Sequence, residues 1–237
     1  TFSGESVWEG KRVGVFPLIP CGECDCCKKH LYEMCSNYSY LGSRCDGGFA
    51  EFVAVPEWNL LELPDNVSFR QAAMLEPMAV AVHAVRQFVI DRDSSVCIIG
   101  LGTIGLLISM FLKAEGVKRV CVVGNKEAQR KHAVSLGIHV EDYYTDIQSV
   151  GKQQFDCVFE CVGKNETVKV SGTWNSSYLA DSDDDWHYVL KHLSEGDIHP
   201  EELITHEYVL SDIVKGMEIM RDKTEDYVKV MCVNPEC

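Results

Sequence analysis

Residues Ser95 to Gly105 read SVCIIGLGTIG, and this stretch decides the fold. A short apolar run over 96–99 leads into the pattern Gly100-x-Gly102-x-x-Gly105, and the apolar segment LLISMFLKAEG follows. The first glycine permits a tight turn, the second lets the backbone approach a pyrophosphate, and the third lets a helix pack closely on the strand. The stretch therefore predicts a strand, a glycine turn and a helix whose N-terminus receives phosphate charge.

The segments that follow repeat this alternation of strand and helix. RVCVVG (119–124) predicts a second strand, KEAQRKHAVSLG (126–137) a helix, and QFDCVFECVG (154–163) a further strand. This order is typical of a parallel sheet that binds a dinucleotide at the carboxyl ends of its strands. The alternative is a glycine-rich turn that binds no ligand. We expect cofactor contacts from Gly100, Gly102, Thr103, Ile104, Gly105 and Gly163.

The end of the second predicted strand bears on the choice of cofactor. NAD-binding folds usually place an acidic residue about 20 positions after the glycines, where it contacts the ribose hydroxyls. Here that position is Gly124, and Asn125, Lys126 and Arg130 follow. A missing carboxylate and two nearby cations favour NADP, or tolerance of it. The alternative is that these are ordinary solvated residues and that NAD binds without an acidic contact.

A cluster of cysteines precedes the glycine pattern. The segment CGECDCCKKHLYEMC begins at Cys21, and Cys21, Cys24, Cys27 and Cys35 follow the spacing C-x2-C-x2-C-x7-C. Short spacings of this kind bring four thiolates onto one tetrahedral ion, which then has no open position for a substrate. We therefore predict a structural zinc and expect Cys26 to be free. A redox pair or disulfides are the alternative.

The composition limits the classes of function. The chain has 237 residues, of which 46% are hydrophobic, and a net charge of −14. This charge opposes non-specific nucleic-acid binding, which needs a basic face. No apolar run has the length of a membrane span, and we find no signal peptide. Eight of the 12 cysteines lie outside the zinc pattern, and several of them lie within predicted apolar strands. Such cysteines are typical of reduced, buried thiols in cytoplasmic proteins. We therefore expect a cytoplasmic protein.

The tail of the chain predicts two helices and a strand. Trp186, Val189, Leu190 and Leu193 recur at helical spacing, and Gly196 follows them. We expect Ser211 to cap a second helix with Ile213, Met217 and Met220 on one face. The alternating segment YVKVMCV predicts a final strand.

A four-cysteine lobe ahead of a dinucleotide fold resembles the zinc-dependent medium-chain dehydrogenases, the family of alcohol and polyol dehydrogenases. The matching stretches are GKRVGVFPLIPCGECDCCKKHLYEMC, YLGSRCDGGFAEFVAVP, LLELPDNVSFRQAAMLEPMAVAVHA, the glycine pattern and FECVG. The resemblance implies an α/β fold in three parts. These are a GroES-like, β-rich catalytic domain with the zinc lobe (1–77), a Rossmann-type doubly wound parallel sheet domain (78–174) and a C-terminal return to the catalytic domain (175–237).

The same resemblance implies a zinc-dependent oxidoreductase that transfers a hydride between NAD or NADP and a secondary alcohol of a polyol. Glu76 in MLEP matches a ligand of the family's catalytic zinc. LGSRCDGGFAEF is similar to the branch that acts on phosphorylated hexitols such as galactitol 1-phosphate, and Arg44 is our candidate for the phosphate contact. By family analogy we expect a homodimer or homotetramer.

Several alternatives stay open. Glu76 also fits a carboxylate at a helix N-terminus, and Arg44 fits a surface pair with Asp46. For the function there are two alternatives. One is a dehydrogenase of an unphosphorylated, sorbitol-type polyol, and the other is a non-catalytic nucleotide-binding relative. Zinc-free quinone reductases would not need the four cysteines.

The sequence also departs from the family pattern. It lacks the family's catalytic cysteine and Gly-His-Glu segment, and it is shorter than the pattern at 6–7 and near Val168. We expect that intervening residues are absent from this sequence, with a deletion variant as the alternative.

Overall fold

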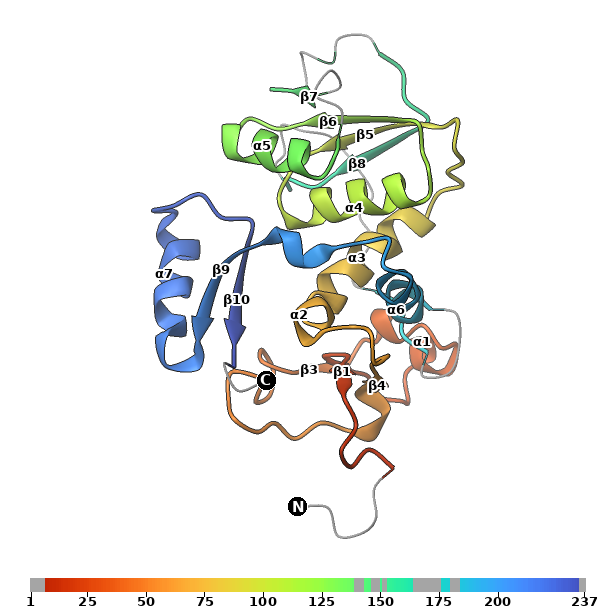
Figure 1. Cartoon of the computed structure of the whole chain (residues 1–237). Coiled ribbons are helices and arrows are strands. Elements are labelled where there is room, and N and C mark those ends of the chain that lie inside the picture. Colours follow the sequence, from red (N-terminus) through yellow and green to blue (C-terminus); the bar gives the residue numbers. More distant parts are fainter. Residues whose placement is uncertain are drawn as a thin grey trace.

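The computed structural model describes residues 7–138, 143–145, 150, 153–163, 176–179 and 184–234. Its four-stranded sheet is parallel, with the order β7-β6-β5-β8. The strands are β5 (Ser95–Ile99), β6 (Arg119–Val123), β7 (Tyr143–Tyr144) and β8 (Cys157–Glu160). Helix α4 (Thr103–Ala114) follows β5, and α5 (Glu127–Ser135) follows β6. The predicted alternation of strand and helix is confirmed (Figure 1). The shortened junction near Val168 lies outside the described residues.

Strand β5 is buried on both faces of the sheet. Val96 and Ile98 belong to the main apolar core, whereas Cys97 and Ile99 pack into a second core with Cys121. Alternate side chains of a strand point to opposite faces, so an uninterrupted apolar run is needed when both faces are covered. The run in SVCIIG therefore follows from the place of β5 within the sheet.

The N-terminal part consists of two small antiparallel sheets and the cysteine lobe. Its strands are β1 (Val13–Val15) with β4 (Leu60–Glu62), and β2 (Leu18–Ile19) with β3 (Ser39–Tyr40). Its helices are short: α1 (Asp25–Lys28), η1 (Tyr32–Met34) and η2 (Glu57–Asn59). Asn59 is fully buried and donates to the carbonyls of Phe16 (2.7 Å) and Leu18 (2.8 Å), which ties the two small sheets together.

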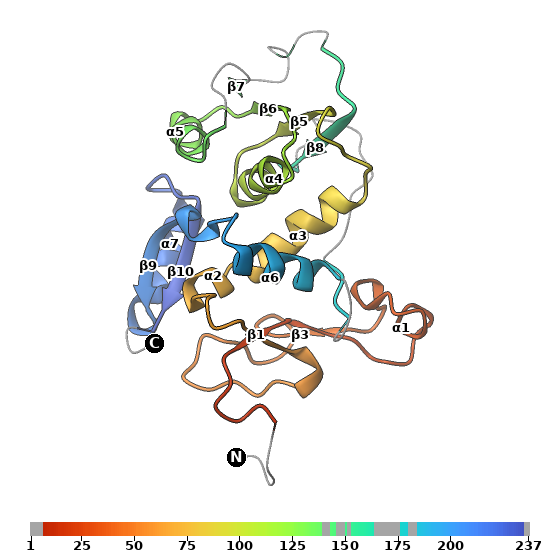
Figure 2. The same ribbon diagram turned by 45° about the vertical axis from the view of Figure 1, so that its right-hand side comes forward.

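Three helices connect this part to the large sheet. They are α2 (Phe69–Ala72), α3 (Leu75–Arg86) and α6 (Asp185–Glu195). Figures 1 and 2 show α4 between the sheet and α3, with α6 beside α3. Phe16, Met78, Leu106 and Trp186 all belong to the same core of buried side chains. The lobe, the helices and one face of the sheet therefore share one continuous apolar core.

The amphipathic helix predicted in the tail is confirmed as α6. Gly196 ends it with φ +73°, a left-handed conformation that glycine adopts without steric cost. Trp186, Val189 and Leu193 are buried, with at most 2% of each residue exposed, as the helical spacing predicted.

A carboxylate fixes α6 against α3. The side chain of Asp185 is only 3% exposed. It accepts hydrogen bonds from His83 Nδ1 (2.8 Å), Arg86 NH1 (3.3 Å), and the backbone N–H and hydroxyl of Ser177 (2.7 Å each). Burial by itself would raise the pKa of Asp185, but the hydrogen bonds from His83 and Ser177 outweigh it and lower that pKa. His83 thus has a structural partner in Asp185.

The C-terminal segment forms a small unit of its own. It contains η5 (Pro200–Leu203), β9 (Ile204–Val209), η6 (Leu210–Asp212), α7 (Ile213–Asp222) and β10 (Lys229–Val233). Strands β9 and β10 are parallel and α7 covers them, so the predicted final strand is confirmed. No helix in the described part of the chain is both long enough and apolar enough to cross a membrane.

The expected cap of the last helix is wrong. Ser211 does not cap α7: it lies within η6, and Asp212 is the N-cap residue without a side-chain hydrogen bond. Met217 and Met220 are each 40% exposed, and Gly216 and Ile219 are buried in their place. The reason is close packing, because a side chain at Gly216 would come within 2.8 Å of Tyr208 and Val230.

We expect Asp185→Ala to lower the free energy of unfolding by about 3 kcal/mol near neutral pH, because it leaves His83 and Arg86 without their shared buried partner. A carboxyl whose pKa is lowered on folding stabilises the protein above its unfolded pKa of about 3.9, and this contribution disappears as the pH falls through the folded value. The difference between wild type and Asp185→Ala should therefore shrink at acidic pH. Chemical denaturation across a pH series measures it.

Asp93→Ala is the matched control. Asp93 pairs with Lys118 on the surface, where the two side chains are 81% and 70% exposed. This variant should cost less than about 1 kcal/mol. Equal losses in the two variants would contradict a special role for the buried carboxylate.

Candidate functional site

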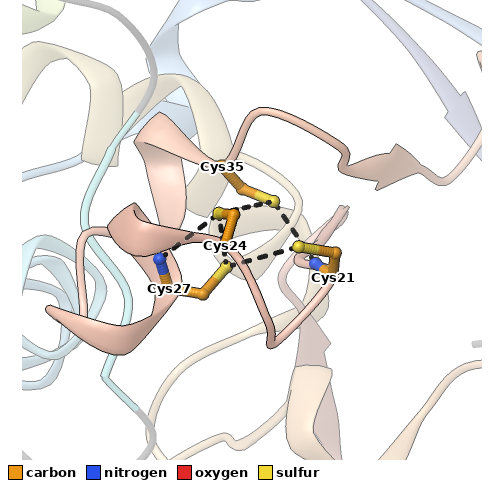
Figure 3. A group of neighbouring side chains, drawn as sticks. All are labelled: Cys21, Cys24, Cys27 and Cys35. Carbon is orange, nitrogen blue, oxygen red and sulfur yellow. Dashed lines mark hydrogen bonds between the residues drawn. The ribbon is translucent and has the colours of Figure 1, made fainter.

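The four predicted cysteines converge in the N-terminal lobe. Figure 3 shows Cys24 and Cys27 at the short helix α1, facing Cys21 and Cys35. The Sγ–Sγ distances are 3.5 Å between Cys24 and Cys27, 3.8 Å between Cys24 and Cys35, and 3.9 Å between Cys21 and Cys27. All four ligand atoms lie within 4.8 Å of one another.

These distances fit a tetrahedral ion. Zinc–sulfur bonds of about 2.3 Å in a tetrahedron place the sulfurs about 3.8 Å apart, whereas a disulfide needs about 2.05 Å. All eleven cysteines in the described part of the chain, Cys26 among them, are free thiols. The donor set therefore suits a closed, four-thiolate zinc site and not a disulfide.

Backbone groups prepare two of the thiols for metal binding. The backbone N–H of Cys27 (3.5 Å) and that of Ser36 donate to Cys24, and they lower the pKa of Cys24 to about 5. Backbone N–H groups of Glu23 and Cys24 likewise lower the pKa of Cys21. Burial raises the pKa of Cys27 to about 12. A cation is therefore needed before all four cysteines are thiolates together.

The glycine pattern lies at the carboxyl end of β5, with the geometry its sequence predicts. Gly100 has φ +98°, and a Cβ atom there would lie 2.6 Å from Val162. A Cβ atom at Gly105 would lie 2.0 Å from the carbonyl oxygen of Gly100. Gly102 faces open space, with nothing within 4 Å of a Cβ atom, and it starts α4, which has no side-chain cap. An uncapped helix N-terminus beside an open backbone is what a pyrophosphate needs.

The next two residues, Thr103 and Ile104, also have defined positions. The hydroxyl of Thr103 donates to the carbonyl of Val228 (2.7 Å), so its side chain joins the glycine turn to the C-terminal segment. Ile104 is partly buried against the main core. Only their backbone groups, in the first turn of α4, are left as candidates for phosphate contacts.

The other predicted cofactor residues lie on the same edge of the sheet. Gly124 ends β6, and its N–H donates to the carbonyl of Tyr144 (2.8 Å). Gly163, with φ +71°, follows β8, and its N–H donates to Glu160 (3.0 Å). Asn125 is exposed. Carboxyl ends of parallel strands meet at one edge, so the glycines at 100–105, 124 and 163 lie along the same edge of the sheet.

The two cations near Gly124 already have partners. Lys126, at the N-cap position of α5, lies 4.0 Å from Asp226, and Arg130 lies 3.9 Å from Glu127. Asp226 belongs to the loop between α7 and β10, far from Lys126 in the sequence. The sequence reading missed this contact, since no local signal links the two residues.

Glu76 lies in the first turn of α3, partly buried, and lines a cavity of about 300 Å³ against β1 and Trp186. The hydroxyl of Tyr40 donates to its Oε1 atom (3.2 Å). Burial and the charge of Glu76 raise the pKa of Tyr40, so the hydroxyl keeps its proton. Burial lowers the pKa of Lys229, and the negative charge of Glu76 opposes this shift. The sequence reading missed both Tyr40 and Lys229 as neighbours of Glu76.

Arg44 is exposed and has a local partner. Its guanidinium lies 3.9 Å from the ring of Tyr38 and donates to the Tyr38 carbonyl (3.0 Å). The structure thus holds Arg44 beside Tyr38, and a phosphate contact by this residue stays a prediction.

A second group of metal-ligating side chains, His192, Glu195 and Asp197, lies at the end of α6. His192 is buried, and its Nδ1 atom already pairs with Asp197 (2.8 Å). We regard this group as a structural hydrogen bond between His192 and Asp197 at the end of the helix.

Comparisons with known proteins agree with this geometry. Residues 3–65 match the alcohol dehydrogenase GroES-like domain. Galactitol 1-phosphate 5-dehydrogenase of Escherichia coli K12 is 38% identical over 128 residues, which are 54% of this chain and 37% of that protein. L-idonate 5-dehydrogenase of Vitis vinifera is 31% identical over 174 residues, 68% of this chain and 48% of that protein.

A solved structure shares the fold. A protein of Sinorhizobium meliloti 1021, assigned as a zinc-binding dehydrogenase and bound to NADP, superposes with a TM-score of 0.82 at 23% identity. The match covers 95% of this chain and 77% of that one. The chain spans less than half the length of the curated relatives that it matches, at 37% and 48%.

We expect about one zinc ion per chain in the purified protein, bound by the four cysteines. Cys24→Ser should lose this zinc and destabilise the lobe, because metal binding contributes folding free energy. Cys26→Ser, which removes a neighbouring thiol outside the cluster, should keep it. Elemental analysis and thermal unfolding measure both effects. Loss of zinc from both variants, or a disulfide among the four cysteines, would contradict the site.

The glycine turn allows a second paired test. Gly105→Ala should cost at least about 2 kcal/mol of stability, because its methyl group meets the Gly100 carbonyl. Gly102→Ala should change stability by less than about 1 kcal/mol, since its methyl group meets only open space. It should nevertheless weaken dinucleotide binding, because the pyrophosphate must approach this backbone. Denaturation and fluorescence titration with NADH and NADPH separate the two outcomes. Normal dinucleotide binding by Gly102→Ala would contradict the proposed position of the pyrophosphate.

Proposed function

We propose that this chain, which shares the sequence features and the fold of the zinc-dependent medium-chain dehydrogenases, is part of a polyol dehydrogenase. The enzyme would transfer a hydride between NAD or NADP and a secondary alcohol of a sugar alcohol. One observation carries the proposal: a four-cysteine cluster and a glycine-lined edge of a parallel sheet lie on elements that flank one continuous apolar core. The matched GroES-like domain and the dehydrogenase relatives support it.

The parts of the chain would divide the work. Residues 1–77 would carry the catalytic domain with the zinc lobe, 78–174 the cofactor domain, and 175–237 the return to the catalytic domain. The first boundary falls within the continuous helix α3, and the second lies outside the described residues. Helix α3 would thus begin with Glu76 in the catalytic part and continue into the core beside the cofactor sheet.

The residues around the sheet edge would bind and orient the cofactor. The N-terminus of α4 would receive the pyrophosphate beside Gly102, and the loop after β6 would receive the adenosine ribose. The nicotinamide would then lie toward Gly163 and the end of β8. The cofactor supplies the redox chemistry, in which the alcohol carbon loses a hydride to the nicotinamide and the hydroxyl loses a proton.

Glu76 is the candidate catalytic residue of this chain. Its contact with Tyr40 fixes the carboxylate, and we assign Glu76 as one ligand of a catalytic zinc, bound directly or through water. Such an ion would supply Lewis acidity toward the substrate hydroxyl. A catalytic zinc takes three protein ligands. In the part of the chain that the structure describes, Glu76 belongs to no group of three metal-ligating side chains. The described residues alone therefore do not hold that ion, and we derive no step through it.

The substrate would be a phosphorylated hexitol such as galactitol 1-phosphate. The similarity to an enzyme named for that substrate supports this assignment, while the similarity to L-idonate 5-dehydrogenase keeps an unphosphorylated polyol as the second candidate. The net charge of −14 repels a phosphate at long range, so the contact must be local. Arg44 is the cation that we propose for it.

Two further properties follow from the same proposal. The free thiols of the described cysteines support a cytoplasmic location. By analogy with two-lobe dehydrogenases, we also propose that the protein assembles as a homodimer or homotetramer.

The substrate assignment predicts a difference between a phosphorylated hexitol and free hexitols. The protein that contains this chain should oxidise galactitol 1-phosphate with a higher kcat/KM than galactitol or sorbitol. Arg44→Ala should lower kcat/KM for the phosphorylated substrate alone, by about 1–3 kcal/mol, the size of a lost charge-assisted hydrogen bond. Steady-state assays with NAD and NADP measure both effects, and the unphosphorylated hexitol is the matched control for Arg44→Ala.

The outcomes separate the candidate functions. A better rate with free galactitol or sorbitol would replace the phosphate assignment by a plain polyol dehydrogenase. Binding of NADH or NADPH without turnover of any polyol would favour the non-catalytic relative. Intact-mass spectrometry of the assayed protein shows whether a Gly-His-Glu segment precedes Phe2, which decides whether the lack of turnover is informative.

A further inference from the structure

The loop between α7 and β10, residues 223–228, touches the cofactor edge at two points. At one end, the carbonyl of Val228 accepts the hydroxyl of Thr103 in the first turn of α4 (2.7 Å). Two residues earlier, the carboxylate of Asp226 lies 4.0 Å from the ammonium of Lys126 at the start of α5. Figures 1 and 2 both show this loop below α5. The loop therefore spans the glycine turn after β5 and the turn after β6.

The second contact falls where a dinucleotide fold distinguishes its cofactors. The residue at the end of the second strand normally supplies a carboxylate to the ribose of NAD, and Gly124 cannot. Among the described residues, the carboxylates paired with the two nearby cations are Asp226, on Lys126, and Glu127, on Arg130. Glu127 is local to α5, whereas Asp226 comes from the C-terminal segment.

We propose that Asp226 is a specificity-determining residue, which disfavours the 2′-phosphate of NADP by holding Lys126 and by repelling the phosphate. The proposal rests on the proposed function, because it presupposes that this edge binds a dinucleotide. Asp226 would perform from another element the role that an acidic residue at position 124 performs in NAD-specific folds. The chain would then bind NAD without penalty and would bind NADP less tightly than its cations alone allow.

Electrostatics set the size of the effect. The side chains of Lys126 and Asp226 are 55% and 68% exposed, so their pairing by itself is weak. A 2′-phosphate carries up to two negative charges and would have to displace the carboxylate from Lys126 while remaining close to it. Removing the carboxylate charge therefore relieves both competition and repulsion. We expect a gain in affinity for a 2′-phosphate of about threefold to tenfold at low salt.

Asp226→Asn in the full chain tests the proposal with two small probes, adenosine 2′,5′-bisphosphate and AMP, and with NADPH and NADH. Calorimetric or fluorescence titration gives the dissociation constants. Asp226→Asn should bind the bisphosphate and NADPH about threefold to tenfold more tightly, while AMP and NADH change by less than about twofold. The gain should diminish at high salt, because exposed charges are screened.

Glu225→Gln is the matched control. It removes the same charge from the same loop, but Glu225 lies 3.4 Å from His206 and not beside Lys126. It should change each affinity by less than about twofold. An equal gain in both variants would mean a general charge effect and would overturn the proposal, as would no gain in Asp226→Asn.

The Lys126→Ala background tests the pairing itself. There Asp226→Asn should have a smaller effect on the bisphosphate, because no ammonium is left to release. An undiminished effect would overturn the role of Lys126. If wild type bound neither AMP nor either dinucleotide, the proposed function would fall together with this inference. Binding of NADH with an unchanged preference would overturn only the inference.

Discussion

The fold depends on the close approach of α4 to the end of β5. A Cβ atom at Gly105 would lie 2.0 Å from the Gly100 carbonyl, so only a glycine lets the helix start this near the strand. This approach brings the uncapped N-terminus of α4 to the sheet edge and sets α4 between the sheet and α3. The side chains buried there, including Leu106 and Met78, then continue into the core beneath the cysteine lobe. The constraint that would create a phosphate site thus also sets how the N-terminal part packs.

Helix α3 links the two kinds of chemistry. Its first turn presents Glu76 to Tyr40, and its last turns present His83 and Arg86 to Asp185. The buried carboxylate of Asp185 fixes the helix at the end opposite to Glu76. The position of the candidate metal ligand therefore also depends on the hydrogen bonds of His83 and Arg86, seven and ten residues further along α3, and not only on its immediate neighbours.

The features that the sequence predicted well are those with local physical causes. Glycines 100, 102 and 105 are required by the backbone geometry of one turn. The four cysteines are required by tetrahedral coordination within a short segment, and α6 follows from its apolar spacing. The features that it missed join distant residues: Tyr40 with Glu76, Asp185 with His83, and Asp226 with Lys126. The buried side of α7 is a further feature that the sequence did not reveal. Gly216 has no apolar side chain to reveal a buried face, yet its lack of a side chain is what lets the helix approach β9 and β10.

The continuity of the main core bears on how this chain denatures. Phe16 near the lobe, Met78 on α3, Leu106 on α4 and Trp186 on α6 share one core, so we expect these elements to unfold in a single cooperative transition. The α7 face is attached less firmly, because Val214, Met217 and Met220 are 40–60% exposed. Local opening and amide exchange should therefore begin there. The part of the molecule that we expect to open most readily is therefore the part that brings Asp226 to Lys126.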